Sequence, residues 1–235
     1  MADSKKPQLE KFVTPAGIAV WPRLHEPDTK FKPEGEYTAK IRLSADDAQP
    51  LIDRIETLIE ETMAKAKTDL NALAKDPKEK AKALKRLKEL KLADKSYRPT
   101  LDDDANETGE VEFNIKMKAK VTNKKTGKVT KLTPKLFDSK GNPLPSSVQI
   151  WGGTTYKVAG RYNPYVSPKG EVGVSLRLEA VQVKNLVSAG SGGNSESYGF
   201  VEEDGFVAEG SEFNDDSGND SEGGTEEGSE GDDDF

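Results

Sequence analysis

Two alternating stretches of the chain place positive charge on one side of a strand. In residues 37–43 and 111–121, apolar and polar residues alternate without interruption. Successive side chains of a strand point to opposite faces, so both stretches predict half-buried strands. Cations spaced along a strand can follow a phosphate backbone, although they could also simply keep an outer sheet face soluble. The cations at the polar positions are Lys40, Arg42, Lys116, Lys118 and Lys120.

Several aromatic residues stand where they could stack on nucleic-acid bases. They lie beside prolines, glycines or charges at the ends of expected elements, which are poor core positions and good stacking positions. This group is Trp21, Phe31, Trp151, Tyr162 and Tyr165. Tyr156 is ambiguous because Val158 shares its face, and Arg161 could pair with a phosphate beside a base stacked on Tyr162. Tyr37 and Phe113 share faces with aliphatic residues and are predicted to be core.

The chain offers few residues for catalysis. It has no cysteine and one histidine, His25, which is expected in a solvated loop. Neither common phosphate-binding glycine spacing occurs. Asp102, Asp103 and Asp104 could supply oxygen ligands to a divalent cation of a nuclease, but a charged turn is the simpler interpretation. We therefore expect no enzyme, no cofactor and no metal site.

Charge divides the chain into two parts. The 48 residues from Ser188 onward contain sixteen carboxylates and no lysine or arginine, whereas residues 1–187 have a net charge of +9. We expect residues 1–187 to form one domain and 188–235 to be a disordered acidic tail, because so few apolar residues cannot offset the entropy of ordering. No apolar run has the length of a membrane span and no signal peptide is apparent. A soluble, intracellular protein is expected.

The order of elements favours a mainly β domain with a helical insertion. A short strand is expected at 17–21, and two helices fall within about 45–95, the first opened by Ser44 and Asp47. Short strands separated by turns follow, which indicates a small barrel. The second helix, with its flanks at 77–98, carries a net charge of +6. It could extend a nucleic-acid path, receive the acidic tail, or be a solvated face.

A set of motifs resembles the single-stranded DNA-binding proteins of short-tailed bacteriophages. The resemblance implies an OB fold, a five-stranded Greek-key barrel, with a helical insert. It also implies sequence-independent binding of single strands in phage DNA replication, recombination and repair, in the cytoplasm of the infected bacterial host. The motifs are Phe31-x-Pro-x-Gly-x-Tyr37, Asp138-Ser-Lys-Gly141, Ile150-x-Gly-Gly153, Tyr156-Lys-Val158, Pro164-Tyr165, Gly173-Val-Ser-Leu-Arg-Leu-Glu179 and the tail ending in Asp-Phe.

The tail has two expected roles. The resemblance implies that it contacts the phage DNA polymerase and helicase-primase, and that members of the family can form homodimers. Its tip, Asp232, Asp233, Asp234 and Phe235, is the expected partner-binding segment. Charge alone suggests that the tail also competes with DNA for the basic surface. The main alternative is an RNA- or duplex-binding chaperone with an acidic autoinhibitory tail.

Overall fold

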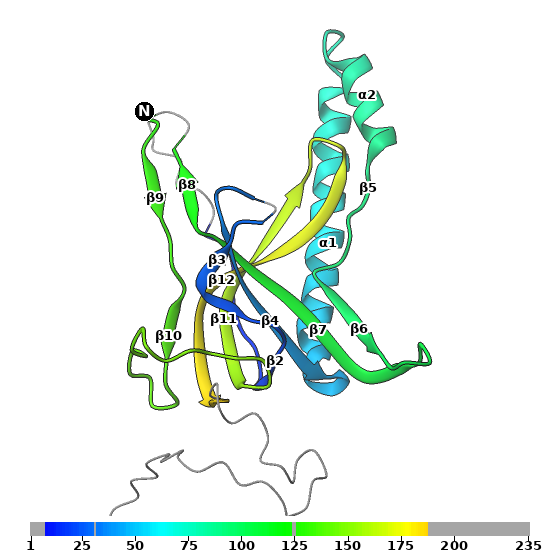
Figure 1. The fold of residues 1–235 in the computed structure, drawn as a ribbon. Helices are drawn as coiled ribbons and strands as arrows, with labels where there is room; N and C mark the ends of the chain where they lie inside the picture. The colour runs from blue at the N-terminus through cyan, green and yellow to red at the C-terminus, as the bar shows by residue number, and fades with distance from the viewer. Residues whose placement is uncertain (1–7, 31, 124–125, 188–235) are drawn as a thin grey trace, which may run out of the picture. The chain divides into compact units, whose positions relative to one another are not determined.

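The computed structural model describes residues 8–30, 32–123 and 126–187 of the 235-residue chain (Figure 1). In these residues the sheet strands enclose the core and two helices stand beside them. In chain order the elements are β1 (Lys11–Val13), β2 (Gly17–Ala19), β3 (Arg23–Asp28), β4 (Glu36–Ser44), α1 (Ala45–Leu73), α2 (Lys80–Glu89), β5 (Lys91–Leu92), β6 (Tyr97–Leu101), β7 (Glu107–Lys118), β8 (Lys120–Thr122), β9 (Val129–Lys131), β10 (Lys135–Phe137), β11 (Thr155–Val166) and β12 (Glu171–Asn185).

Five strands close into a barrel. Strand β2 pairs with β4, β4 with β7, β7 with β12, β12 with β11, and β11 again with β2. All of these pairs are antiparallel except β7–β12, which is parallel. This ring is that of an OB barrel whose strands in chain order are β2, β4, β7, β11 and β12. The expected fold class, a mainly β OB barrel with a helical insert, is confirmed.

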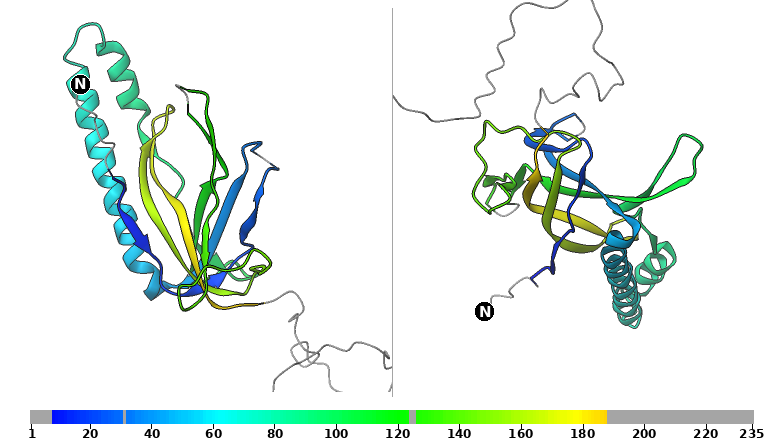
Figure 2. Two further views of the ribbon diagram at one scale, coloured as in Figure 1. Left: turned by 90° about the vertical axis from the view of Figure 1, so that its left-hand side faces the viewer. Right: turned by 90° about the horizontal axis from the view of Figure 1, so that it is seen from below.

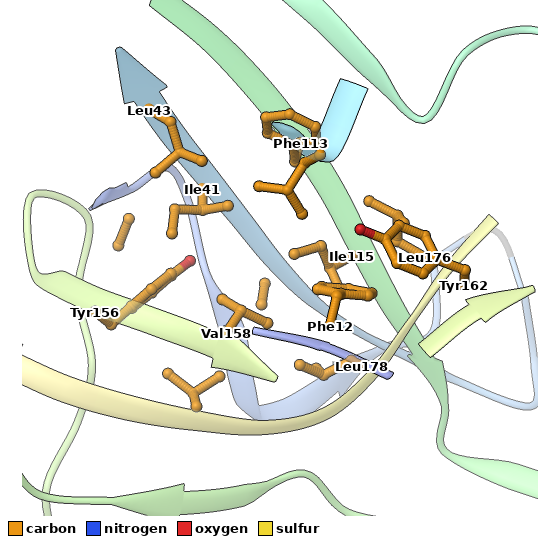
Figure 3. Packing of buried hydrophobic residues seen from close by; sticks show 14 of the residues in the cluster. Phe12, Ile41, Leu43, Phe113, Ile115, Tyr156, Val158, Tyr162, Leu176 and Leu178 are labelled. Atoms are coloured by element: carbon orange, nitrogen blue, oxygen red, sulfur yellow. The ribbon is translucent and has the colours of Figure 1, made fainter. Parts of the chain in front are cut away.

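Alternation of residue type creates the barrel interior. In β4 the apolar residues at every second position are buried, and β11 repeats the pattern. Figure 3 shows side chains from β1, β4, β7, β11 and β12 meeting in one cluster. Phe113 and Tyr156 are fully buried in it. The other side chains of each strand point outward, so the buried pattern also fixes which residues can meet a ligand.

Two glycines let strands approach closely. A Cβ atom on Gly17 would lie 2.4 Å from the carbonyl oxygen of Arg42, and one on Gly160 would lie 2.3 Å from that of Arg177. Any larger residue would push β2 away from β4, or β11 away from β12. The barrel therefore needs glycine at both positions to close.

The helical insert lies between β4 and β7 and stands beside the barrel (Figure 2). Helix α1 begins directly after Ser44, whose hydroxyl oxygen accepts a hydrogen bond of 3.2 Å from the Asp47 backbone N–H. This confirms the predicted cap. Proline at position 50 would favour a later start, near Gln49, but the helix already begins at Ala45 and runs through Pro50. Its buried stripe packs on the barrel and comprises Ala48, Leu51, Ile55, Leu58 and Ile59.

The structure corrects several expected boundaries. The strand expected at 111–121 ends at Lys118, because Ala119 is buried and the chain turns into β8 there. Residues 128–137, whose pattern predicts one strand, form two, β9 paired with β8 and β10 paired with β12. The pattern of the second helix predicts an end at about Leu92, but α2 ends at Glu89. Strands β3 and β6 were not predicted, since prolines and charges interrupt their alternation.

Candidate nucleic-acid interface

A row of mostly cationic side chains crosses the outside of the barrel. The strand registers join these residues as direct neighbours: Lys11 with Arg161, Arg161 with Arg177, Arg177 with Lys116, Lys116 with Thr38, and Thr38 with Arg23. Directly opposed residues share a face, so the row runs over six strands from β1 to β3. At about 4.8 Å per strand it spans roughly 24 Å around the barrel. We call these six residues the cationic row.

Beside this row, three cations surround a buried carboxylate. Glu112 on β7 is only 6 % exposed, yet its carboxylate lies 2.9 Å from Arg98, 3.2 Å from Arg42 and 3.9 Å from Lys40. Burial by itself would raise the pKa of Glu112, but the hydrogen bonds from Arg98 and Arg42 outweigh it and hold that pKa below its usual range. Glu112 therefore stays ionised and holds three cations of the outer face in place.

The same cluster forms a shallow hollow on the outer face of β4, β6 and β7. It encloses about 140 Å³, and Lys40, Lys95, Arg98 and Asn114 are among the residues that line it. In an OB barrel, the face of the second and third strands is a usual oligonucleotide-binding surface, as are the loops between strands one and two and between strands four and five. Strands β4 and β7 are the second and third strands here. The hollow therefore lies where this fold binds single strands.

The four predicted cations of β4 and β7 lie on this side of their strands, and each already contacts a carboxylate. Lys116 is 3.5 Å from Glu36, and Lys118 is 3.7 Å from Glu34. The Lys118–Glu34 pair is exposed on both sides and so contributes little to stability, and a phosphate can replace its carboxylate at small cost. Lys120 is exposed but begins β8 instead of continuing the line of β7.

Both tryptophans lie near β2, at the edge of the same surface. Trp21 is 82 % exposed and takes the left-handed φ of 46° where β2 gives way to β3. Trp151 is 47 % exposed. Backbone hydrogen bonds tie their surroundings together, from Gly153 N–H to the Ala19 oxygen at 3.0 Å and from Val20 N–H to the Lys40 oxygen at 2.9 Å. The segments that carry the two exposed tryptophans are thus held to β2, and β2 is held to β4.

Two other predicted stacking residues are core residues. Tyr156 is fully buried and its hydroxyl donates a hydrogen bond of 2.7 Å to the Lys40 carbonyl oxygen. Tyr162 is 5 % exposed and its ring centroid lies 4.9 Å from that of Phe12. Neither ring face is open to a base, so the stacking predictions for them are wrong. The inward positions of β11 decide this, and Figure 3 shows both rings in the barrel interior.

The remaining predicted residues have varied positions. The Arg161 guanidinium belongs to the cationic row but donates hydrogen bonds to Glu179 and to the Leu9 oxygen. Arg161 lies on the outward side of β11 and Tyr162 on the inward side, so Arg161 cannot pair with a phosphate beside a base stacked on Tyr162. Tyr165 is half-buried near Gly173. Outside the described residues lie Phe31 and the tip residues Asp232, Asp233, Asp234 and Phe235.

The arginines that complete this surface are not among the residues predicted from the sequence. Arg23 and Arg98 lie on the unpredicted strands β3 and β6, and Arg177 is an exposed outward residue of β12. The alternation of β12 could have revealed Arg177, since its neighbours Leu176 and Leu178 are apolar. Nothing in the sequence predicts that Arg177 lies beside Lys116, because that contact depends on the parallel pairing of β7 with β12.

The residues considered for proton transfer and metal binding are His25 and the cluster that begins at Asp102. His25 lies on β3 and not in a loop; its Nε2 is buried without a partner among the described residues, and burial lowers its pKa. Asp102 accepts hydrogen bonds from the backbone of Asp104 and Asn106, as in a charged turn. In the described part of the chain no group of three metal-ligating side chains is found. No helix of that part is long and apolar enough to cross a membrane.

Comparisons with known proteins show the family to which the chain belongs. The family model described as "Single-stranded DNA-binding protein, Bacteriophage T7" matches residues 17–186. A single-stranded DNA-binding protein of Enterobacteria phage T3 is 29 % identical over 179 residues, which cover 75 % of this chain and 73 % of that protein. The crystal structure of gp2.5, a single-stranded DNA-binding protein encoded by bacteriophage T7, matches with a TM-score of 0.62 and 25 % identity, over 86 % of this chain and 100 % of that one. The chain therefore belongs to the family of bacteriophage T7 single-stranded DNA-binding proteins.

Proposed function

We propose that the chain binds single-stranded DNA, without strong sequence preference, on the outer face of β3, β4, β7 and β12. The observation that carries this proposal is the cationic row, which no buried ion pair or catalytic group explains. The family supports it, because its members are DNA-binding proteins and not enzymes. The chain is accordingly not an enzyme, as expected from its sequence.

Phosphates and bases would be held by different parts of this surface. The phosphates replace carboxylates such as Glu34 and Glu36 on Lys118 and Lys116. The bases stack on Trp21 and Trp151, which accept any base because every base has a π-face. Neither interaction reads the edges of bases, so binding is independent of sequence.

Equilibrium titrations test this proposal. Single-stranded DNA, RNA and duplex of equal length are titrated while tryptophan fluorescence is followed at several salt concentrations. Single strands should quench the fluorescence far more than duplex does. With ~4–6 phosphates neutralised, the slope of log affinity against log salt should be roughly −3 to −4. Equal quenching by duplex or tighter binding of RNA would favour the nucleic-acid chaperone instead.

For its biological role, we propose that the protein protects single strands in phage DNA replication, recombination and repair, in the cytoplasm of the host. The acidic tail would recruit the phage DNA polymerase and helicase-primase through Asp232, Asp233, Asp234 and Phe235, and the protein could act as a homodimer. The support is the charge of the tail, −16 against +9 for residues 1–187. Pull-down of either partner with the full chain, but not with a chain lacking Phe235, tests the recruitment.

The tail would also compete with DNA. A flexible chain of 48 residues has a reach of roughly 35–40 Å, which exceeds the roughly 16 Å radius of gyration of a compact domain of 187 residues. Deletion of residues 188–235 should therefore tighten DNA binding, most clearly at low salt. Unchanged affinity after this deletion would contradict the competition.

A further inference from the structure

Helix α2 carries exposed positive charge that lies outside the surface formed by the barrel strands. Only Ala83 of this helix is buried. Lys80, Arg86 and Lys88 are exposed, and none of them has an acidic partner within 4.0 Å among the described residues. Lys82 and Lys85 reach Glu79 and Glu89 only at 3.9 Å. Packing explains the apolar side of the helix, but it gives no reason for unpaired cations on the other sides.

The chain itself connects these cations to the barrel surface. After α2, strand β5 pairs with the start of β12, and Lys91 lies 3.2 Å from Glu171. Lys95 follows, and it lines the same hollow as Lys40 and Arg98. Lys95 also contacts Glu56 at 2.7 Å. Cations thus recur along the chain from α2 through β5 to β6, a course that the ribbon in Figure 1 shows.

The end of α2 also packs on a loop that OB barrels use for oligonucleotides. Residues 167–170 join β11 to β12, the fourth and fifth barrel strands, and this connection is one of the two usual binding loops. A Cβ on Gly170 would lie 2.5 Å from the Glu89 oxygen, and Lys91 N–H donates to the Gly170 oxygen at 3.0 Å. A cleft of about 390 Å³ between the helices and this loop is lined by Arg86, Pro168 and others. The helix is thereby fixed beside a nucleic-acid-binding loop.

From these observations we propose that the insert is a second part of the single-strand site. A strand that leaves the β4–β7 face passes Arg98, Lys95 and Lys91 and places its next phosphates along α2. At about 100° per residue, Lys80 and Lys88 share one side of this helix, whereas Arg86 faces the cleft. The proposal rests on single-strand binding by the barrel and extends its length. At about 3.3 Å per strand residue, the path along 91–98 adds roughly 23 Å to the site. A long oligonucleotide uses both parts, whereas a short one is held by the barrel alone.

A triple substitution separates the two parts. Lys80→Gln, Arg86→Gln and Lys88→Gln together remove three charges, and glutamine is a good helix former, so α2 is retained. The matched control is Lys135→Gln, Lys140→Gln and Lys184→Gln, three exposed lysines outside the insert with the same loss of charge. Oligothymidylates of about 6 and about 20 nucleotides are titrated with each full-length protein, since OB folds cover roughly 4–16 nucleotides.

The affinities for the two oligonucleotide lengths show whether α2 belongs to the binding site. The α2 variant should bind the long oligonucleotide about 10- to 100-fold more weakly near 0.1 M salt, with a salt slope shallower by about 2, and should bind the short one within about twofold of the parent. The control variant should lose much less on the long oligonucleotide. Equal losses on both lengths, an equal loss in the control, or no loss at all would overturn the proposal. Failure of the parent itself to prefer single strands over duplex would instead overturn the barrel site.

Discussion

Replacement of Glu112 by glutamine should tighten the binding of single-stranded DNA. Glu112 holds Arg98, Arg42 and Lys40 at 2.9–3.9 Å and competes with DNA phosphates for them. Glu112→Gln keeps the shape and adds one net positive charge to the surface. At ~0.7 log units per charge and per decade of salt, affinity near 0.1 M should rise about three- to fivefold and converge with the parent toward 1 M.

Fluorescence titrations at four salt concentrations measure this effect. Glu60→Gln is the matched control, because Glu60 is exposed on α1 and has no ion-pair partner among the described residues. It should change affinity far less. Weaker binding by Glu112→Gln at every salt concentration would refute the reasoning, since it would mean that Glu112 positions the cations for DNA and does not compete for them.

The same substitution changes the pH dependence of stability. The pKa of Glu112 is lowered in the folded protein, so its contribution to stability is present above the unfolded pKa of about 4.3 and is lost as pH falls through the lower folded value. Near neutral pH, Glu112→Gln should cost about 1 kcal/mol, because the Arg98 partner is 70 % exposed and screened by solvent. Urea unfolding at several pH values should show a smaller acid-induced loss in the variant. Parallel curves for both proteins would contradict the assignment.

Three further substitutions test individual contacts. Trp21→Ala should weaken binding by about 1–3 kcal/mol, the value of one stacked base, with little change in unfolding because the ring is 82 % exposed; unchanged affinity would remove Trp21 from the site. Tyr156→Phe should lower the free energy of unfolding by about 1 kcal/mol through loss of the buried bond to the Lys40 oxygen, and leave DNA affinity unchanged in titration; a loss of affinity alone would contradict its core role. Ser44→Ala should cost about 1 kcal/mol in urea unfolding by removing the cap on Asp47 N–H, and an unchanged midpoint would show that the cap contributes nothing.

Local patterns predicted the parts of the fold that depend on local physics. The alternation of 37–43 predicted β4 and its outward Lys40 and Arg42, and the Ser44 cap predicted the start of α1. The patterns failed where packing overrides them. Tyr162 stands beside a proline-containing segment, which predicts that it ends a strand. Instead, β11 continues to Val166, and the Tyr162 ring points inward onto Phe12.

Strand pairing determined which cations lie side by side, and the sequence alone does not show this. Sequence alone established the division between a basic domain and an acidic tail, since charge can be counted without a fold. It also established that two strands carry cations on one face, because side-chain direction follows from a period of two. The union of Lys11, Arg161, Arg177, Lys116 and Arg23 in one row depends on registers between strands up to about 150 residues apart. Such registers are fixed only when the barrel closes around its core, so the tertiary structure alone brings scattered cations into one row.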